Sequence, residues 1–146
     1  MAGYKVHISG SLLFCGILYF FPFWCSLPPL GKVICVLLAV FFGLLPDVDT
    51  KSKGQALFLY LVLIINGVLI YREEYKRAAY LGFLVILPLL SRHRGWTHST
   101  CAMLLVPGAL YVAAIQYTHH SAYDLLPYFL AALLGYASHL VIDRVL

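Results

Sequence analysis

The ionisable residues of this chain are few, and those able to bind a metal gather in four short clusters. Only six of the 146 residues are acidic, and three of these share the clusters with four of the six histidines. Because ionisable side chains are costly in or near hydrocarbon, such grouping indicates a functional site. Imidazole and carboxylate ligands together suit zinc, manganese or iron, so the chemistry that the clusters share is metal binding. The candidate ligands are His7, Asp47, Asp49, His93, His98, His139 and Asp143.

Two of the clusters have spacings that favour convergence on one ion. His139 and Asp143 are four residues apart on a helical run, so their side chains lie on one face, one turn apart. Pro46 should end the preceding helix and leave Asp47 and Asp49 in a turn, where both carboxylates can point inward. Each pattern also has a structural explanation, because a His-Asp pair can simply hold a helix in place and an Asp-x-Asp turn can cap one.

The third cluster combines candidate ligands with a bend in the chain. His93 and His98 flank Gly95, which would let the backbone approach a ligand closely. Arg92 and Arg94 beside them could bind phosphate oxygens bidentately and offset charge that develops in a transition state, so they are the candidate catalytic residues. The alternative is an interface-anchoring loop whose arginines face lipid headgroups.

Composition places the chain in a membrane. Hydrophobic residues make up 62% of the sequence and charged residues 11%, with a mean hydropathy of +0.89, whereas a soluble domain carries roughly 25% charged residues. The net charge of +4 is scattered, without a Lys/Arg tract or interleaved stacking aromatics, so no nucleic-acid partner is expected. The four cysteines form no Cys-x-x-Cys pair, which argues against a thiolate site.

The apolar runs predict a single all-α domain over residues 1–146, a polytopic helical bundle with about six membrane segments. The runs cover 8–25, 30–46, 55–71, 78–91, 100–118 and 125–146. A bilayer core of about 30 Å takes around 20 helical residues, with a lower limit near 17. The run over 78–91 is short and contains Pro88, so it could be sheltered by neighbouring helices or enter the membrane only shallowly.

Six crossings would bring all four clusters to one membrane face. The N-terminus, the 47–54 loop, the 91–99 loop and the C-terminal end then share a side, and the loops at 26–29, 72–77 and 119–124 share the other. The face with the clusters collects six basic residues against four opposite, so positive-inside counting predicts that the metal site faces the cytoplasm.

The ordered set of motifs closely resembles the YdjM-like bacterial inner-membrane proteins, which are described as metal-dependent hydrolases. The resemblance rests on Pro46-Asp47-Val48-Asp49, on His93-Arg94-Gly95-x-Thr97-His98-Ser99, on Gly135-x-x-Ser138-His139-Leu140-x-x-Asp143 and on a histidine close to the N-terminus. It implies an inner-membrane hydrolase with the seven candidate ligands around metal. Family members continue past the last helix with a Gly-containing loop and another apolar stretch, which implies that this chain is either truncated or a compact variant.

The expected reaction follows from the ligands and from this resemblance. A looser similarity to the zinc-dependent phospholipase C and nuclease group suggests hydrolysis of a phosphoester, with one or two ions of zinc, or of manganese or iron, activating water. A site at the membrane surface points to phospholipid or lipid-linked substrates, with membrane lipids as partners. Two alternatives remain open. One is a structural metal or ion-pair site in a protein that binds partners, and the other is a metal-ion transporter, which should carry ligands on both faces.

Overall fold

All regular structure in the described residues is helical, which confirms the predicted all-α class. The computed structural model describes residues 3–49, 53–89, 96–118 and 120–145. The longer helices are α1 (Tyr4–Cys15), α3 (Pro29–Leu44), α4 (Lys53–Tyr71), α5 (Tyr75–Leu89), α6 (Thr100–Thr118) and α7 (Ala122–Val145). Short α2 (Pro22–Ser26) and the 3₁₀ turns η1 (Gly16–Phe20), η2 (Leu45–Asp49) and η3 (Trp96–His98) connect them.

Three helices among the described residues are long and apolar enough to cross a membrane. They cover Pro29–Asp47, Thr100–Thr118 and Ala122–Val145, and shorter apolar helices cover Tyr4–Phe20 and Gln55–Tyr71. The structure therefore supports three of the six predicted membrane segments. Helix α5 shows why, because its 15 residues extend only about 22 Å at 1.5 Å per residue, less than the thickness of a bilayer core.

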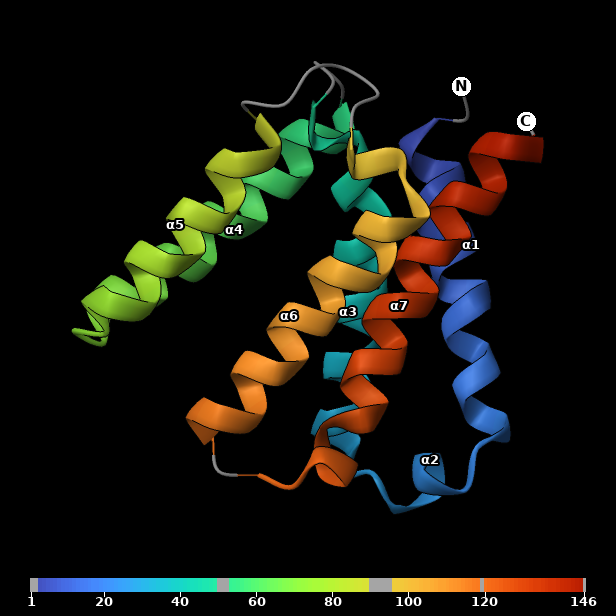
Figure 1. Cartoon of the computed structure of the whole chain (residues 1–146), viewed down its shortest axis with the longest axis horizontal. Coiled ribbons are helices and arrows are strands. Elements are labelled where there is room, and N and C mark those ends of the chain that lie inside the picture. The colour runs from blue at the N-terminus through green and yellow to red at the C-terminus, as the bar shows by residue number, and fades with distance from the viewer. Residues whose placement is uncertain (1–2, 50–52, 90–95, 119, 146) are drawn as a thin grey trace.

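The centre of the bundle is the packing of α3 against α7, with α1 and α6 beside them (Figure 1). Small residues let these helices approach closely, as is usual where both partners sit in lipid. A Cβ atom added at Gly135 would collide with the backbone of Ala39, and one added at Gly43 would collide with Ser11 Oγ. The backbones of α3 and α7 are thus nearly in contact, and the Ser11 side chain of α1 packs directly on Gly43 of α3.

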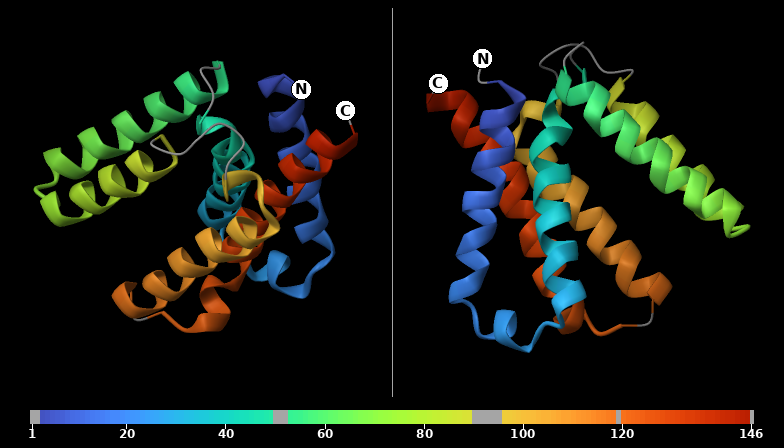
Figure 2. Two further views of the ribbon diagram at one scale, coloured as in Figure 1. Left: turned by 45° about the horizontal axis from the view of Figure 1, so that its top comes forward. Right: turned by 180° about the vertical axis from the view of Figure 1, so that it is seen from behind.

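Helices α4 and α5 form a hairpin that contacts the rest mainly at one end. Figure 2 shows the hairpin leaning away from α3 along its length. At its attached end, Phe58 and Val85 join a buried cluster with Phe42, Leu45 and Tyr136. This cluster holds η2 between the hairpin and the central helices, and η2 carries Asp47.

The segments that carry the candidate ligands gather at one end of the bundle. The start of α1, the η2 turn, the start of α6 and the end of α7 lie together at the top of Figure 1, although they span the whole sequence. The turn between α4 and α5, short α2 and the start of α7 lie toward the opposite end. The alternation of helix directions predicted from the sequence thus places the described motifs on one side.

Candidate metal centre

Five predicted ligands from four separate elements meet at this end of the bundle. They are His7 of α1, Asp47 of η2, His98 of η3, and His139 and Asp143 of α7. His7 and His139 are almost fully buried, with exposed fractions of 1% and 0%. The carboxylates keep a small exposed edge. Convergence of these side chains over 136 residues of sequence is the feature that the motif pattern predicted.

Local sequence explains how two of the ligands are presented. Pro46 lies in the 3₁₀ turn that ends α3, and this turn directs the buried Asp47 toward α7. Ser99 accepts a hydrogen bond at Oγ from the Ala102 N–H at 3.0 Å and donates from Oγ to the Trp96 carbonyl at 2.6 Å. As the N-cap of α6, Ser99 fixes the angle between η3 and the helix, and thereby the position of His98.

The three imidazoles point their Nε2 atoms at the two carboxylates. Nε2 of His139 lies 3.6 Å from Asp47 Oδ1 and 3.5 Å from Asp143 Oδ2. Nε2 of His98 lies 3.8 and 3.5 Å from the same two oxygens. Nε2 of His7 faces the other oxygens, at 3.8 Å from Asp47 Oδ2 and 3.6 Å from Asp143 Oδ1. These separations are longer than the roughly 2.9 Å of an N–H···O hydrogen bond.

These spacings leave buried polar atoms without partners among the described residues. The Nε2 atoms of His7, His98 and His139 are buried and have no hydrogen-bond partner in the part of the chain that the structure describes. Each such atom costs roughly 1–3 kcal/mol, so a set of three facing two carboxylates needs an explanation other than ion pairing within the protein. A bound cation that accepts their lone pairs supplies one.

The donor set fits a transition metal in both chemistry and spacing. Ligand atoms about 2.0–2.1 Å from a tetrahedral zinc lie roughly 3.3–3.5 Å from one another, close to the 3.5–3.8 Å found here. Four residues each offer one ligand atom, and these atoms all lie within 4.8 Å of one another; the residues are Asp47, His98, His139 and Asp143. Imidazole and carboxylate at such distances are ligands for zinc, manganese or iron.

Backbone carbonyls and hydroxyls orient the ligands. His139 donates from Nδ1 to the Gly43 carbonyl at 2.8 Å, and because a carbonyl can only accept, this bond leaves Nε2 as the nitrogen with a free lone pair. Nδ1 of His98 lies 3.3 Å from Thr97 Oγ1. Tyr136 donates its hydroxyl to the Thr97 carbonyl, which ties η3 to α7.

Two serines meet between α1 and α7 just below the ligands. The Oγ atoms of Ser11 and Ser138 lie 3.2 Å apart, and either hydroxyl can donate to the other. The serine that accepts donates its own proton within its helix, Ser11 to the His7 carbonyl at 2.8 Å or Ser138 to the Gly135 carbonyl at 2.7 Å. Sequence reasoning assigned no role to Ser11, Ser138, Thr97 or Tyr136. The available signal was spacing, because Ser11 lies one helical turn after His7 and Ser138 adjoins His139.

An open pocket of about 310 Å³ reaches the centre from one side. Its lining consists of His98, Leu140, Asp143 and Arg144. A small polar molecule can therefore approach Asp143 and His98, whereas His7 and His139 lie behind them. Arg144 is exposed at the rim.

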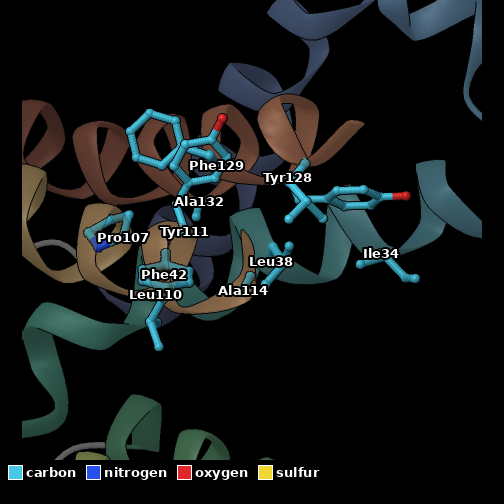
Figure 3. Close-up of a pocket in the computed structure, with 11 residues that line it drawn as sticks. Ile34, Leu38, Phe42, Pro107, Leu110, Tyr111, Ala114, Tyr128, Phe129 and Ala132 are labelled. Atoms are coloured by element: carbon cyan, nitrogen blue, oxygen red, sulfur yellow. The ribbon is translucent and has the colours of Figure 1, made fainter. Parts of the chain in front are cut away.

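A separate apolar pocket of about 320 Å³ lies among α3, α6 and α7 (Figure 3). Among the described residues, no histidine or carboxylate lines it. Phe42 and Leu110 also line a smaller pocket of about 110 Å³ that extends to Thr97 and Tyr136. Two apolar pockets thus lie on the side of the bundle that carries η3.

Four predicted site residues are not placed by these observations. Arg92, His93 and Arg94 lie outside the described residues. Asp49 ends η2, but its side chain is also outside the part of the chain that is described. Their assignment as catalytic residues and ligands stays a prediction.

Comparison with known proteins agrees with the motifs. The sequence profile described as YdjM inner membrane protein matches residues 4–145, nearly the whole chain. The comparisons with curated proteins and with solved structures gave no match. An inner-membrane family, together with three apolar helices of spanning length, places the protein in a membrane. The chain belongs to the YdjM inner membrane protein family.

Proposed function

We propose that this protein is a membrane-bound metal-dependent hydrolase that cleaves phosphoester or lipid-linked substrates at the candidate metal centre. The observation that carries the proposal is the set of three buried Nε2 atoms that face two carboxylates and have no hydrogen-bond partner among the described residues. A divalent transition metal bound there would lower the pKa of a coordinated water to about 7 and so supply a hydroxide nucleophile.

The described residues would divide the remaining work. Asp47, His98, His139 and Asp143 would hold the metal, zinc in the first instance, with manganese or iron as alternatives. The bond from His139 Nδ1 to the Gly43 carbonyl keeps the ring in the orientation that a ligand needs. Substrate would enter the pocket beside Asp143, where Arg144 can attract an anionic oxygen.

Two features support an amphiphilic substrate. The site lies at one end of a membrane bundle, where a lipid headgroup can reach it. The apolar pockets beside α3, α6 and α7 could take a hydrocarbon chain while its polar end approaches the ligands. Arg92 and Arg94, which precede η3 in the sequence, would then bind the phosphate oxygens of the substrate. By charge counting, this end of the bundle would face the cytoplasm.

The open pocket favours an enzyme over a purely structural metal site. Structural sites close all coordination positions with protein ligands, whereas catalytic sites leave one accessible. Here Asp143 and His98 border a pocket of about 310 Å³. A transporter would need ligands along a path through the bundle. At the opposite end, the described side chains include the exposed Glu74–Arg77 ion pair at 3.0 Å and Asp124, which accepts a hydrogen bond from Ser121 at 2.7 Å.

The test is a metal analysis joined to a substrate screen. Protein purified in detergent would be assayed for bound metal, then for hydrolysis of phosphomonoesters, phosphodiesters and phospholipids with added zinc or manganese. Asp143→Asn should lose metal and turnover together, while His120→Ala, at an exposed histidine outside the centre, should lose neither. Turnover that survives complete removal of metal would refute the proposed mechanism.

A further inference from the structure

The rings of His7 and His139 cannot both bind one ion. They are stacked, with centroids 3.9 Å apart and planes 17° from parallel. An imidazole nitrogen donates along a lone pair that lies in the plane of its ring. Two rings that share a metal must therefore have planes that intersect at it, whereas stacked rings direct their lone pairs to separate points.

The separation of those points can be worked out from the stack. A metal about 2.1 Å beyond Nε2 lies roughly 3 Å from the ring centroid. Over these roughly 3 Å, the 17° angle between the ring planes changes the distance between the two metal positions by about 1 Å from the distance between the centroids. The two points are then about 3–5 Å apart, a range that contains the 3.5–4 Å typical of paired metal ions. His98 differs from His7 in this respect, because its ring meets that of His139 at 69°, with centroids 5.4 Å apart. Their planes cross, so these two rings can share an ion.

The carboxylate oxygens divide in the same way. Nε2 of His98 and Nε2 of His139 both approach Oδ1 of Asp47 and Oδ2 of Asp143, at 3.5–3.8 Å. Nε2 of His7 approaches the opposite oxygens, Oδ2 of Asp47 at 3.8 Å and Oδ1 of Asp143 at 3.6 Å. Each carboxylate thus presents one oxygen to each group of imidazoles, which is the arrangement of a bridging ligand.

We propose that the centre binds two ions, one held by His98 and His139 and the other by His7, with Asp47 and Asp143 bridging them. This inference rests on the proposed metal binding and deepens it by giving His7 a separate ion. Two divalent cations, two carboxylates and neutral imidazoles leave a net charge of roughly +2. That charge favours an anionic substrate, so it selects phosphoesters over neutral carboxylic esters. Paired ions can also stabilise both the attacking and the leaving oxygen of a phosphoryl displacement.

The experiment counts ions and asks whether they are neighbours. Metal-free protein in detergent would be titrated with Mn²⁺, followed by elemental analysis and electron paramagnetic resonance. We expect about two ions per chain in the original protein, with the spectrum of an exchange-coupled pair. His7→Ala should keep about one ion and give the spectrum of isolated Mn²⁺, and the control His120→Ala should keep the pair.

Binding of only one ion by the original protein at saturation, or of two by His7→Ala, would overturn the proposal. If His7→Ala fails to fold, as judged by circular dichroism and gel filtration, the count and spectrum of the original protein decide alone. The outcomes also separate this inference from the proposed hydrolase. Two coupled ions without hydrolysis of any phosphoester would leave the pair standing and refute the enzyme. One bound ion together with metal-dependent hydrolysis would refute the pair of ions and support the enzyme. No bound metal would refute both proposals.

Discussion

Replacing Gly135 by alanine should push α3 and α7 apart and destabilise the bundle. The added Cβ would collide with the carbonyl oxygen, carbonyl carbon and Cα of Ala39, all of them backbone atoms that no side-chain rotation can move. Overpacking of this kind costs roughly 1–3 kcal/mol. Gly67→Ala in α4 is the matched control, because a Cβ there meets nothing within 4 Å. Both substitutions share the gain in helix propensity of about 1 kcal/mol, so the difference between them isolates the collision.

The assay is unfolding of both variants in mixed micelles with increasing sodium dodecyl sulfate, followed by far-UV circular dichroism. Gly135→Ala should unfold with a free energy about 1–3 kcal/mol lower than Gly67→Ala. Gly135 lies one turn before His139, so displacement of α7 should also weaken metal binding in Gly135→Ala but not in the control. Equal stability and equal metal affinity in the two variants would refute the reasoning that close backbone approach of α3 and α7 positions the ligands.

Arg144→Ala should spare folding and metal content yet lower phosphoesterase turnover on the order of 10²-fold. Arg144→Lys should recover little of this turnover, because the point charge of lysine cannot reproduce the bidentate fork of the guanidinium, and steady-state kinetics check both variants. Tyr136→Phe should leave the buried Thr97 carbonyl without its donor and cost about 1–3 kcal/mol in the unfolding assay. Acidification should release metal, since ligating histidines must be neutral; dialysis across a pH series measures it, and pH-independent affinity would contradict imidazole ligation. Single cysteines at positions 4 and 74, on a background without the native cysteines, should label from opposite sides of the membrane.

The ligands could be predicted from sequence because ionisable groups stand out in an apolar chain. His7, Asp47, His98, His139 and Asp143 were all named as ligands, and all five meet. Their convergence followed from alternating helix directions, which place successive connections on alternate faces. The number of membrane spans was less predictable. The hydropathy of a short apolar helix such as α5 predicts a membrane span, although the helix is shorter than the thickness of a bilayer core.

The parts that sequence did not reveal depend on contacts between distant residues. Ser11 and Ser138 pair across 127 positions, and nothing in either neighbourhood marks the partner. Serine and tyrosine are also ordinary in membrane helices, so their polarity alone carries little signal. The stacking of His7 on His139 has the same origin, because it depends on how α1 leans against α7 and not on any local spacing. The proposal of two ions rests on this stack, and the residue types and spacings of the seven candidate ligands could not supply it.

The geometry also links metal binding to the stability of the fold. The ligands come from α1, η2, η3 and α7, four elements that otherwise meet through a few hydrogen bonds and close backbone contacts. Without metal, the buried Nε2 atoms of His7, His98 and His139 would have no partner among the described residues, at a cost of roughly 1–3 kcal/mol each. The proposed metal binding would remove that cost only in the folded chain, because the unfolded chain does not bring the ligands together. Added metal should therefore also stabilise this end of the bundle against unfolding.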